Sequence, residues 1–381
     1  MTILEWHRTT VPAAALALLA MIPASPLAAQ AMPQHRTQHV ILLTIDGVRG
    51  QELFGGMDSM IAAGGDSSGI HDVERLRRDY WRQTAEARRR ALMPWFWDSL
   101  VPRGILYGDR QLESPASITN HQGFSAPGYL EILTGEAQPD VTSNDRRRYG
   151  HRTILEYVRR RLSLPATGVA AITSWENFHE YVASDSTAVL VSAGLLPVPL
   201  ELLTPAIREL DRLSRRAVPL WDGTRLDAFT GAIALEYLKR QRPTLLFISF
   251  DDTDDLAHSR RYDRLLDAFH GTDDFLRELW HVVQSTSGLK DQTTLVVTTD
   301  HGRGFTMRDW TDHGHDVPGS EQIWIAIMGP DTPALGEARQ LPVHQDNIAA
   351  TLLQFLGLKG EDFNAHAGLP LPRAFGPASR R

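Results

Sequence analysis

Several stretches of the chain are continuously apolar and rich in β-branched residues, with no regular alternation between apolar and polar positions. Continuous runs of this kind are typical of strands that are buried on both faces of a sheet. The first run ends at Asp46 and Gly47, a pair that suits a turn. The pattern predicts strands at residues 39–45, 168–175, 188–194, 244–250, 293–299 and 323–328.

Longer, more polar segments with helical stretches separate these runs. Strands that alternate with helices are typical of an α/β fold, with a mostly parallel central sheet and helices on both of its faces. Sheets of this type bind ligands at the carboxyl ends of their strands. The predicted helices cover residues 73–92, 152–162, 227–240, 261–285 and 345–356.

The N-terminal region has the pattern of a secretory signal peptide over residues 1–29. A short basic start precedes an apolar run at 11–22, and small residues around Ala29 follow. The run is short for a bilayer span, so an uncleaved membrane anchor is the less favoured alternative. We therefore expect a bacterial periplasmic or secreted protein, without a transmembrane segment once the signal is removed. The expected organisation continues with one large domain over 36–365, an insert or cap within 141–240, and a flexible tail over 366–381.

Charge and cysteine content narrow the chemistry. The formal net charge is −7, which offers no basic face for general nucleic-acid binding. The chain has no cysteine, so an exported protein of this size must rely on its core and not on disulfides. Any metal ion must then be held by histidine and carboxylate side chains.

Acidic residues and histidines gather close to the ends of the predicted strands. An Asp that follows a strand is commonly a turn or helix cap, so one such group alone is weak evidence. Four groups that meet at one edge of a sheet are harder to explain in that way, and oxygen and imidazole ligands suit divalent metals. The candidates are Asp46, Asp254, His258, Asp300, His301, His313 and His315.

A second feature is Ser125, which is followed by Pro127 at the start of an apolar segment. Serine before a proline-started turn is a favoured helix N-cap. A serine at this position also lies beside free backbone N–H groups, which suit a phosphate. A hydroxyl is a poor nucleophile without an activating base or metal, and no Gly-x-Ser-x-Gly elbow surrounds Ser125. A metal is the predicted activator.

With these features, the chain resembles the alkaline phosphatase superfamily, and most of all its nucleotide pyrophosphatase/phosphodiesterase (type I phosphodiesterase) branch. That branch has a hydroxyl nucleophile, then Pro two residues later, and then Thr-Gly. Ser125, Pro127, Thr134 and Gly135 match this spacing, although the branch usually has threonine as its nucleophile. The resemblance covers roughly residues 40–358.

The metal-ligand motifs of the branch also have counterparts. Asp254 and His258 keep the spacing of its Pro-Asp-x-x-Gly-His motif, with Ala257 in place of glycine. The Asp-His pair of the branch matches Asp300 and His301. The remaining counterparts are Asp46 for the aspartate after the first strand and His313 for the first histidine of a His-Gly-x-Asp motif.

The resemblance implies two divalent metal ions, most simply Zn²⁺, although manganese or iron would also suit these ligands. It implies that one metal is held by Asp254, His258 and His313, with His315 as the alternative to His313. It implies an Asn that contacts a phosphate oxygen, and Asn144 is the best candidate. The second metal is then held by Asp46, Asp300, His301 and the Ser125 oxygen.

The expected function is hydrolysis of small-molecule phosphate esters, either monoesters or diesters, through a phosphoseryl intermediate on Ser125. A sulfatase is disfavoured because Tyr129 stands where a C/S-x-P-x-R motif needs arginine. A phosphomutase of the same superfamily is disfavoured by the export signal. A catalytically silent metal-binding envelope protein is the alternative from another class. The natural substrate and the oligomeric state remain open.

Overall fold

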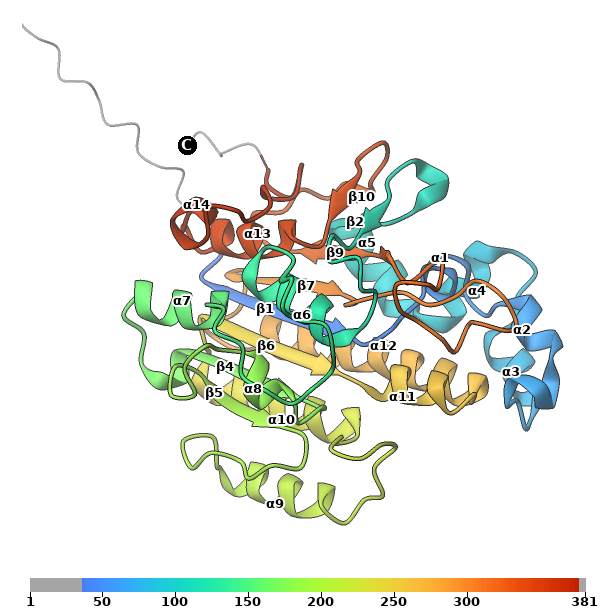
Figure 1. Cartoon of the computed structure of the whole chain (residues 1–381), viewed down its shortest axis with the longest axis horizontal. Coiled ribbons are helices and arrows are strands. Elements are labelled where there is room, and N and C mark those ends of the chain that lie inside the picture. Colours follow the sequence, from blue (N-terminus) through green and yellow to red (C-terminus); the bar gives the residue numbers. More distant parts are fainter. Residues whose placement is uncertain (1–35, 377–381) are drawn as a thin grey trace, which may run out of the picture. The chain divides into compact units, whose positions relative to one another are not determined.

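A central sheet organises the part of the chain that this computed structural model describes, residues 36–376 (Figure 1). The predicted signal peptide lies outside the described residues. The sheet has eight strands. Across the sheet these are β10 (Gly336–Glu337), β2 (Ile105–Tyr107), β9 (Ile325–Met328), β7 (Thr293–Thr298), β1 (His39–Ile45), β6 (Leu245–Phe250), β4 (Val169–Thr173) and β5 (Leu190–Ala193).

The middle of the sheet is parallel, as the continuous apolar runs predict. Strand β1 pairs in parallel with both β6 and β7, and β4 pairs in parallel with β5 and β6. Strand β9 runs antiparallel to β7 and to β2. The predicted α/β fold with a mostly parallel sheet is therefore confirmed, with one reversed strand.

A second, small sheet was not predicted. Its three strands, in spatial order, are β11 (Val343–His344), β3 (Ala116–Ser117) and β8 (Gln322–Ile323). Each strand has only two residues, which is too short to show a period in the sequence. The predicted strand at 323–328 therefore divides between two sheets.

Helices cover both faces of the central sheet. Alternate residues of β1 enter different cores, with Ile41 and Leu43 in one and Val40 and Leu42 in the other. The first core packs under α10 (Asp227–Gln241) and α12 (Tyr262–Ser285), and the second under α6 (Ser125–Thr134), α7 (Ile154–Arg161) and α13 (Asn347–Phe355).

The helix predicted at 73–92 is two helices, α3 (Val73–Tyr80) and α4 (Ala85–Leu92). Trp81 is extended, and the Thr84 side chain accepts a hydrogen bond from the Ala87 N–H to cap α4. The remaining α-helices are α1 (Gly50–Gly55), α2 (Ser59–Ala63), α5 (Val101–Arg103), α8 (Phe178–Tyr181), α9 (Pro205–Ser214), α11 (Asp252–His258) and α14 (Gly360–Phe363).

Two predicted domain boundaries need adjustment. Residues 141–240 contain β4 and β5, which are strands of the central sheet, so this range as a whole is not an insert. In the predicted tail, Leu371 and Ala374 are buried against the second core, so packing extends beyond residue 365. No helix within residues 36–376 is long and apolar enough to cross a membrane.

Candidate metal centre

Neighbouring strands bring three predicted ligands together at one edge of the sheet. Strands β1 and β7 pair in register, so Asp46 and Asp300 emerge side by side beyond their carboxyl ends. The His301 Nε2 atom lies 3.3 Å from Asp46 Oδ1 and 3.5 Å from Asp300 Oδ2. We call Asp46, Asp300 and His301 the inner ligand set; all three are buried.

In each carboxylate of the inner ligand set, only one of the two oxygens accepts a hydrogen bond. Tyr129 donates its hydroxyl hydrogen to Asp46 Oδ2 at 2.9 Å, and the Gly47 N–H donates to Asp300 Oδ1 at 3.1 Å. The other two oxygens, Asp46 Oδ1 and Asp300 Oδ2, are buried and have no hydrogen-bond partner within the described residues. Buried polar atoms are rarely left unpaired, and these two face an imidazole nitrogen. This donor set fits a divalent cation.

The other predicted ligands form a second group at the side of the first. His258 Nε2 lies 3.2 Å from Asp254 Oδ2 and 3.0 Å from His313 Nε2. Asp254 and His258 share one face of α11 because they are four residues apart. The rings of His301 and His313 stack with their centroids 4.2 Å apart, so the two groups adjoin. We call Asp254, His258 and His313 the outer ligand set.

Backbone carbonyls orient two of the imidazoles. His313 Nδ1 lies 3.3 Å from the Gly123 carbonyl oxygen, and His301 Nδ1 lies 2.9 Å from that of Gly302. A hydrogen on each Nδ1 leaves the Nε2 lone pair free to bind a metal. His315, the rival ligand, is different: its side chain is 68% exposed and pairs with Asp316. The geometry therefore favours His313.

Ser125 is the first residue of α6, and Phe124 occupies the N-cap position, so the predicted N-cap role of Ser125 is wrong by one residue. The serine is buried, and its Oγ lies 3.5 Å from His301 Nε2. The predicted nucleophile is thus within a side chain's reach of the inner ligand set.

The Asn144 side chain contacts the first turn of α6, although Asn144 follows that helix in the sequence. Its Oδ1 accepts a hydrogen bond from the Ala126 N–H at 2.9 Å. Asn177 donates to the Asn144 carbonyl oxygen at 2.8 Å and holds this segment in place. The Ala126 N–H therefore already donates to Asn144.

Burial and charge shift the titration of both ligand sets. Burial, with the nearby negative charge of Asp46, raises the pKa of Asp300 to about 8. Burial opposes protonation of His301, but the charges of Asp300 and Asp46 prevail and raise its pKa to about 9. Burial and the charge of His301 lower the pKa of both His258 and His313. Without a cation, the raised pKa values favour the protonated forms of Asp300 and His301, and the lowered pKa values favour the neutral forms of His258 and His313.

Two other aspartates near the ligand sets accept hydrogen bonds from backbone N–H groups. The Asp227 carboxylate accepts hydrogen bonds from the Asp251 and Asp252 N–H groups at 2.8 and 3.1 Å. Asp252 Oδ1 in turn accepts from the Asp227 N–H at 3.3 Å. Asp252 therefore links α10 to α11.

Two supporting residues escaped the sequence analysis. Tyr129 lies one helical turn after Ser125, and this four-residue spacing on a helix is the only sign of its place beside Asp46. Arg303 comes two residues after His301, is 1% exposed, and forms an ion pair with Asp254. No spacing rule pointed to it.

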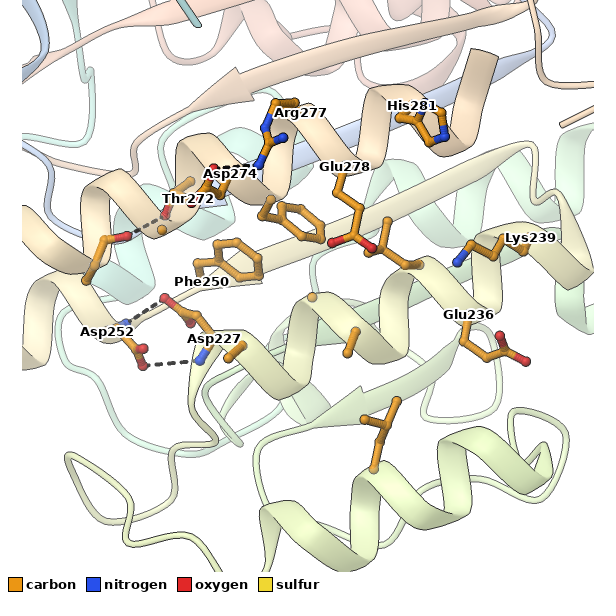
Figure 2. Close-up of a pocket in the computed structure, with 18 of the residues that line it drawn as sticks. Asp227, Glu236, Lys239, Phe250, Asp252, Thr272, Asp274, Arg277, Glu278 and His281 are labelled. Atoms are coloured by element: carbon orange, nitrogen blue, oxygen red, sulfur yellow. Dashed lines mark hydrogen bonds and ion pairs between the residues drawn. The ribbon is translucent and has the colours of Figure 1, made fainter. Parts of the chain in front are cut away.

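A cavity in the described residues lies away from both ligand sets. Figure 2 shows this cavity of about 880 Å³ between α10 and α12. Asp227 and Asp252 line one part of it, and Lys239, Glu278 and His281 line another. No residue of either ligand set lines it.

Comparison with known proteins gives the same family as the motifs. The family model of type I phosphodiesterase / nucleotide pyrophosphatase matches residues 161–334. This range contains Asp300, His301 and the whole outer ligand set, but it excludes Asp46 and Ser125. No curated protein matches the chain.

Solved structures share the fold at low sequence identity. The alkaline phosphatase PafA is 10% identical, with a TM-score of 0.57, over 91% of this chain and 100% of that one. The lipoteichoic acid synthase LtaP from Listeria monocytogenes is 11% identical, with a TM-score of 0.53, over 84% and 72%. The phosphonate monoester hydrolase of Agrobacterium radiobacter is 14% identical, with a TM-score of 0.50, over 84% and 74%.

The motifs, the family-model match and the shared fold agree with one another. The resemblance predicted from the sequence is therefore confirmed: the chain is similar to hydrolases of the alkaline phosphatase superfamily, and the matching family within it is that of type I phosphodiesterase / nucleotide pyrophosphatase.

Proposed function

We propose that this protein is a two-metal hydrolase of phosphate esters that uses Ser125 as its nucleophile. Its substrates are small-molecule phosphomonoesters or phosphodiesters, and its place of action is the periplasm or the exterior of a bacterial cell. The inner and outer ligand sets would each hold one divalent cation, for which Zn²⁺ is the first choice.

One observation carries the proposal. Two buried carboxylate oxygens without hydrogen-bond partners face His301 Nε2, and Ser125 Oγ lies 3.5 Å from the same nitrogen. A fold that buries acidic oxygens in this way gains nothing unless a cation compensates them. A hydroxyl beside that position is placed for activation.

The bound cations would supply Lewis-acid activation of the hydroxyl and stabilise charge on the leaving oxygen. Ser125 itself attacks phosphorus: a bond forms between Oγ and phosphorus as the bond from phosphorus to the leaving oxygen breaks. The serine proton passes to solvent, and the leaving alkoxide takes a proton from solvent. Water then attacks the phosphoseryl group, which breaks the Oγ–phosphorus bond and returns a proton to Ser125.

The start of α6 and Asn144 orient the phosphoryl group in this account. An α-helix N-terminus presents N–H groups and a positive dipole end to an anion. The Asn144 NH₂ group would donate to a non-bridging oxygen, since the Ala126 N–H fixes the opposite side of that amide. These donors act on charge that increases in the transition state.

A substrate panel tests the proposal. Purified protein is assayed on a chromogenic phosphomonoester, a phosphodiester, a phosphonate monoester and an aryl sulfate, with and without chelator. We expect hydrolysis of a phosphate ester that chelator abolishes and zinc restores. Activity on the sulfate alone would favour a sulfatase, and no activity on any ester with two zinc ions bound would favour a binding protein.

A further inference from the structure

A buried arginine next to the metal centre has no role in the account above. Arg303 is 1% exposed and lies two residues after His301. Burial of a guanidinium is costly unless its donors are satisfied, and a buried ion pair is often no more stabilising than apolar packing. Its position therefore needs an explanation other than fold stability.

The donors of Arg303 reach three separate segments. Its Nε donates to the Gly47 carbonyl oxygen at 3.1 Å, and its Nη1 donates to the Thr311 carbonyl oxygen at 2.5 Å. Its Nη2 pairs with Asp254 Oδ1 and also lies 3.4 Å from the Asp254 carbonyl oxygen. Each segment carries a ligand: Gly47 follows Asp46, Thr311 precedes His313 by two residues, and Asp254 is itself a ligand.

The two oxygens of the Asp254 carboxylate have different partners. Oδ1 accepts from Arg303, while Oδ2 lies 3.2 Å from His258 Nε2. The rigid planar fork of arginine fixes such an orientation, whereas the flexible ammonium of lysine does not. One oxygen is thus held and the other is directed toward the histidine.

The turn after β1 is shaped to admit this arrangement. Gly47 has a φ of +61°, and a Cβ atom there would lie 2.6 Å from Asp254 Oδ1 and 2.9 Å from Arg303 Nε. Any side chain at residue 47 would therefore push Arg303 and Asp254 apart. The glycine and the arginine form one unit.

We propose that Arg303 is a positioning residue that joins Asp254 to the Gly47 and Thr311 backbone and thereby sets the metal affinity of the outer ligand set. The proposal rests on the proposed two-metal function. Residues that orient metal ligands typically contribute roughly 10- to 100-fold to metal affinity.

The test compares Arg303→Met with a matched control. Arg225 is also buried and donates to Thr173, Ser192 and Thr230, which lie in neither ligand set, so Arg225→Met reports the general cost of removing a buried arginine. Metal-free proteins are titrated with Zn²⁺ in equilibrium dialysis, with bound zinc measured by elemental analysis. We expect wild type and Arg225→Met to bind two zinc ions with similar affinity.

In Arg303→Met, one zinc ion should bind as in wild type and the other at least about tenfold more weakly. If this variant does not fold, Arg303→Lys keeps the charge but loses the fork, and it should show the same selective loss. Two zinc ions bound with wild-type affinity in a folded Arg303 variant would overturn the role of Arg303 alone. A wild-type protein that binds no zinc would instead overturn the two-metal function, and with it this inference.

Discussion

The inner and outer ligand sets differ in how the fold holds them. The inner set lies at the ends of the adjacent strands β1 and β7, and its residues are at most 1% exposed. The outer set comes from the short helix α11 and a loop, and the side chain of His258 is 38% exposed. The inner set is thus fixed by the sheet, while the outer set depends on loop contacts such as those of Arg303.

This difference indicates that the two ligand sets have different roles within one metal centre. Each carboxylate of the inner set has one buried oxygen without a hydrogen-bond partner. These oxygens destabilise the folded protein when no cation is bound. The outer imidazoles are neutral and closer to solvent, which favours exchange of a cation, substrate or water. Ser125 lies next to the inner set, so the rigid half of the centre serves the nucleophile.

The largest effect is expected from Ser125→Ala. Loss of the hydroxyl should reduce turnover by roughly a thousandfold or more, because no other group can form the covalent intermediate. Metal content should remain at two ions per chain, since both ligand sets keep their own side chains. Steady-state kinetics and elemental analysis check this, and a rate similar to that of wild type would refute the nucleophile.

Asp300→Asn tests whether the buried carboxylates of the inner ligand set destabilise the metal-free protein. It removes a carboxylate whose pKa burial raises to about 8, so the metal-free variant should unfold at a higher temperature than metal-free wild type. The variant should also lose the inner cation and most activity. Thermal unfolding with and without zinc measures both effects. A lower unfolding temperature of the metal-free variant would contradict the idea that the inner set is held at a cost.

His258→Ala tests the outer ligand set, with His315→Ala as its control. His258 lies within 3.2 Å of two other outer ligands, whereas the His315 side chain is 68% exposed. We expect the first variant to lose one metal ion and the second to keep both, as measured by elemental analysis. Equal metal loss in the two variants would mean that the outer set is wrongly assigned.

Glu131 is also a buried carboxylate, but unlike those of the inner ligand set it has hydrogen-bond donors for both of its oxygens, and the expected effect of changing it is smaller. It accepts from the backbone N–H groups of Thr119 and Asn120 and from both of their side chains. Glu131→Gln should therefore destabilise the protein, by about 1–3 kcal/mol at acidic pH.

The pH dependence of this effect follows from burial, which raises the pKa of Glu131 from 4.5 to about 7. A raised folded-state pKa gives stability that is complete below 4.5 and is lost as the pH rises through 7. Glutamine does not titrate, so the advantage of wild type over Glu131→Gln should shrink across this range. Urea unfolding of metal-free protein at several pH values measures it, and an advantage that grows with pH would contradict this sign.

The sequence predicts the inner part of this molecule better than its periphery. The strands β1, β6 and β7 are continuous apolar runs, and the ligands that follow them are expected at one sheet edge. The two-residue strands and the break between α3 and α4 leave no periodic signal. Contacts such as Tyr129 to Asp46 and Arg303 to Gly47 join segments that are distant in the sequence, and only the folded chain shows them.

Anomalous diffraction from crystals grown with zinc would locate the bound cations themselves. The account predicts two zinc peaks, one in contact with Asp46, Asp300, His301 and the Ser125 oxygen, and the other with Asp254, His258 and His313. Zinc bound only at other surface residues, with both ligand sets empty in a protein that hydrolyses phosphate esters, would contradict it.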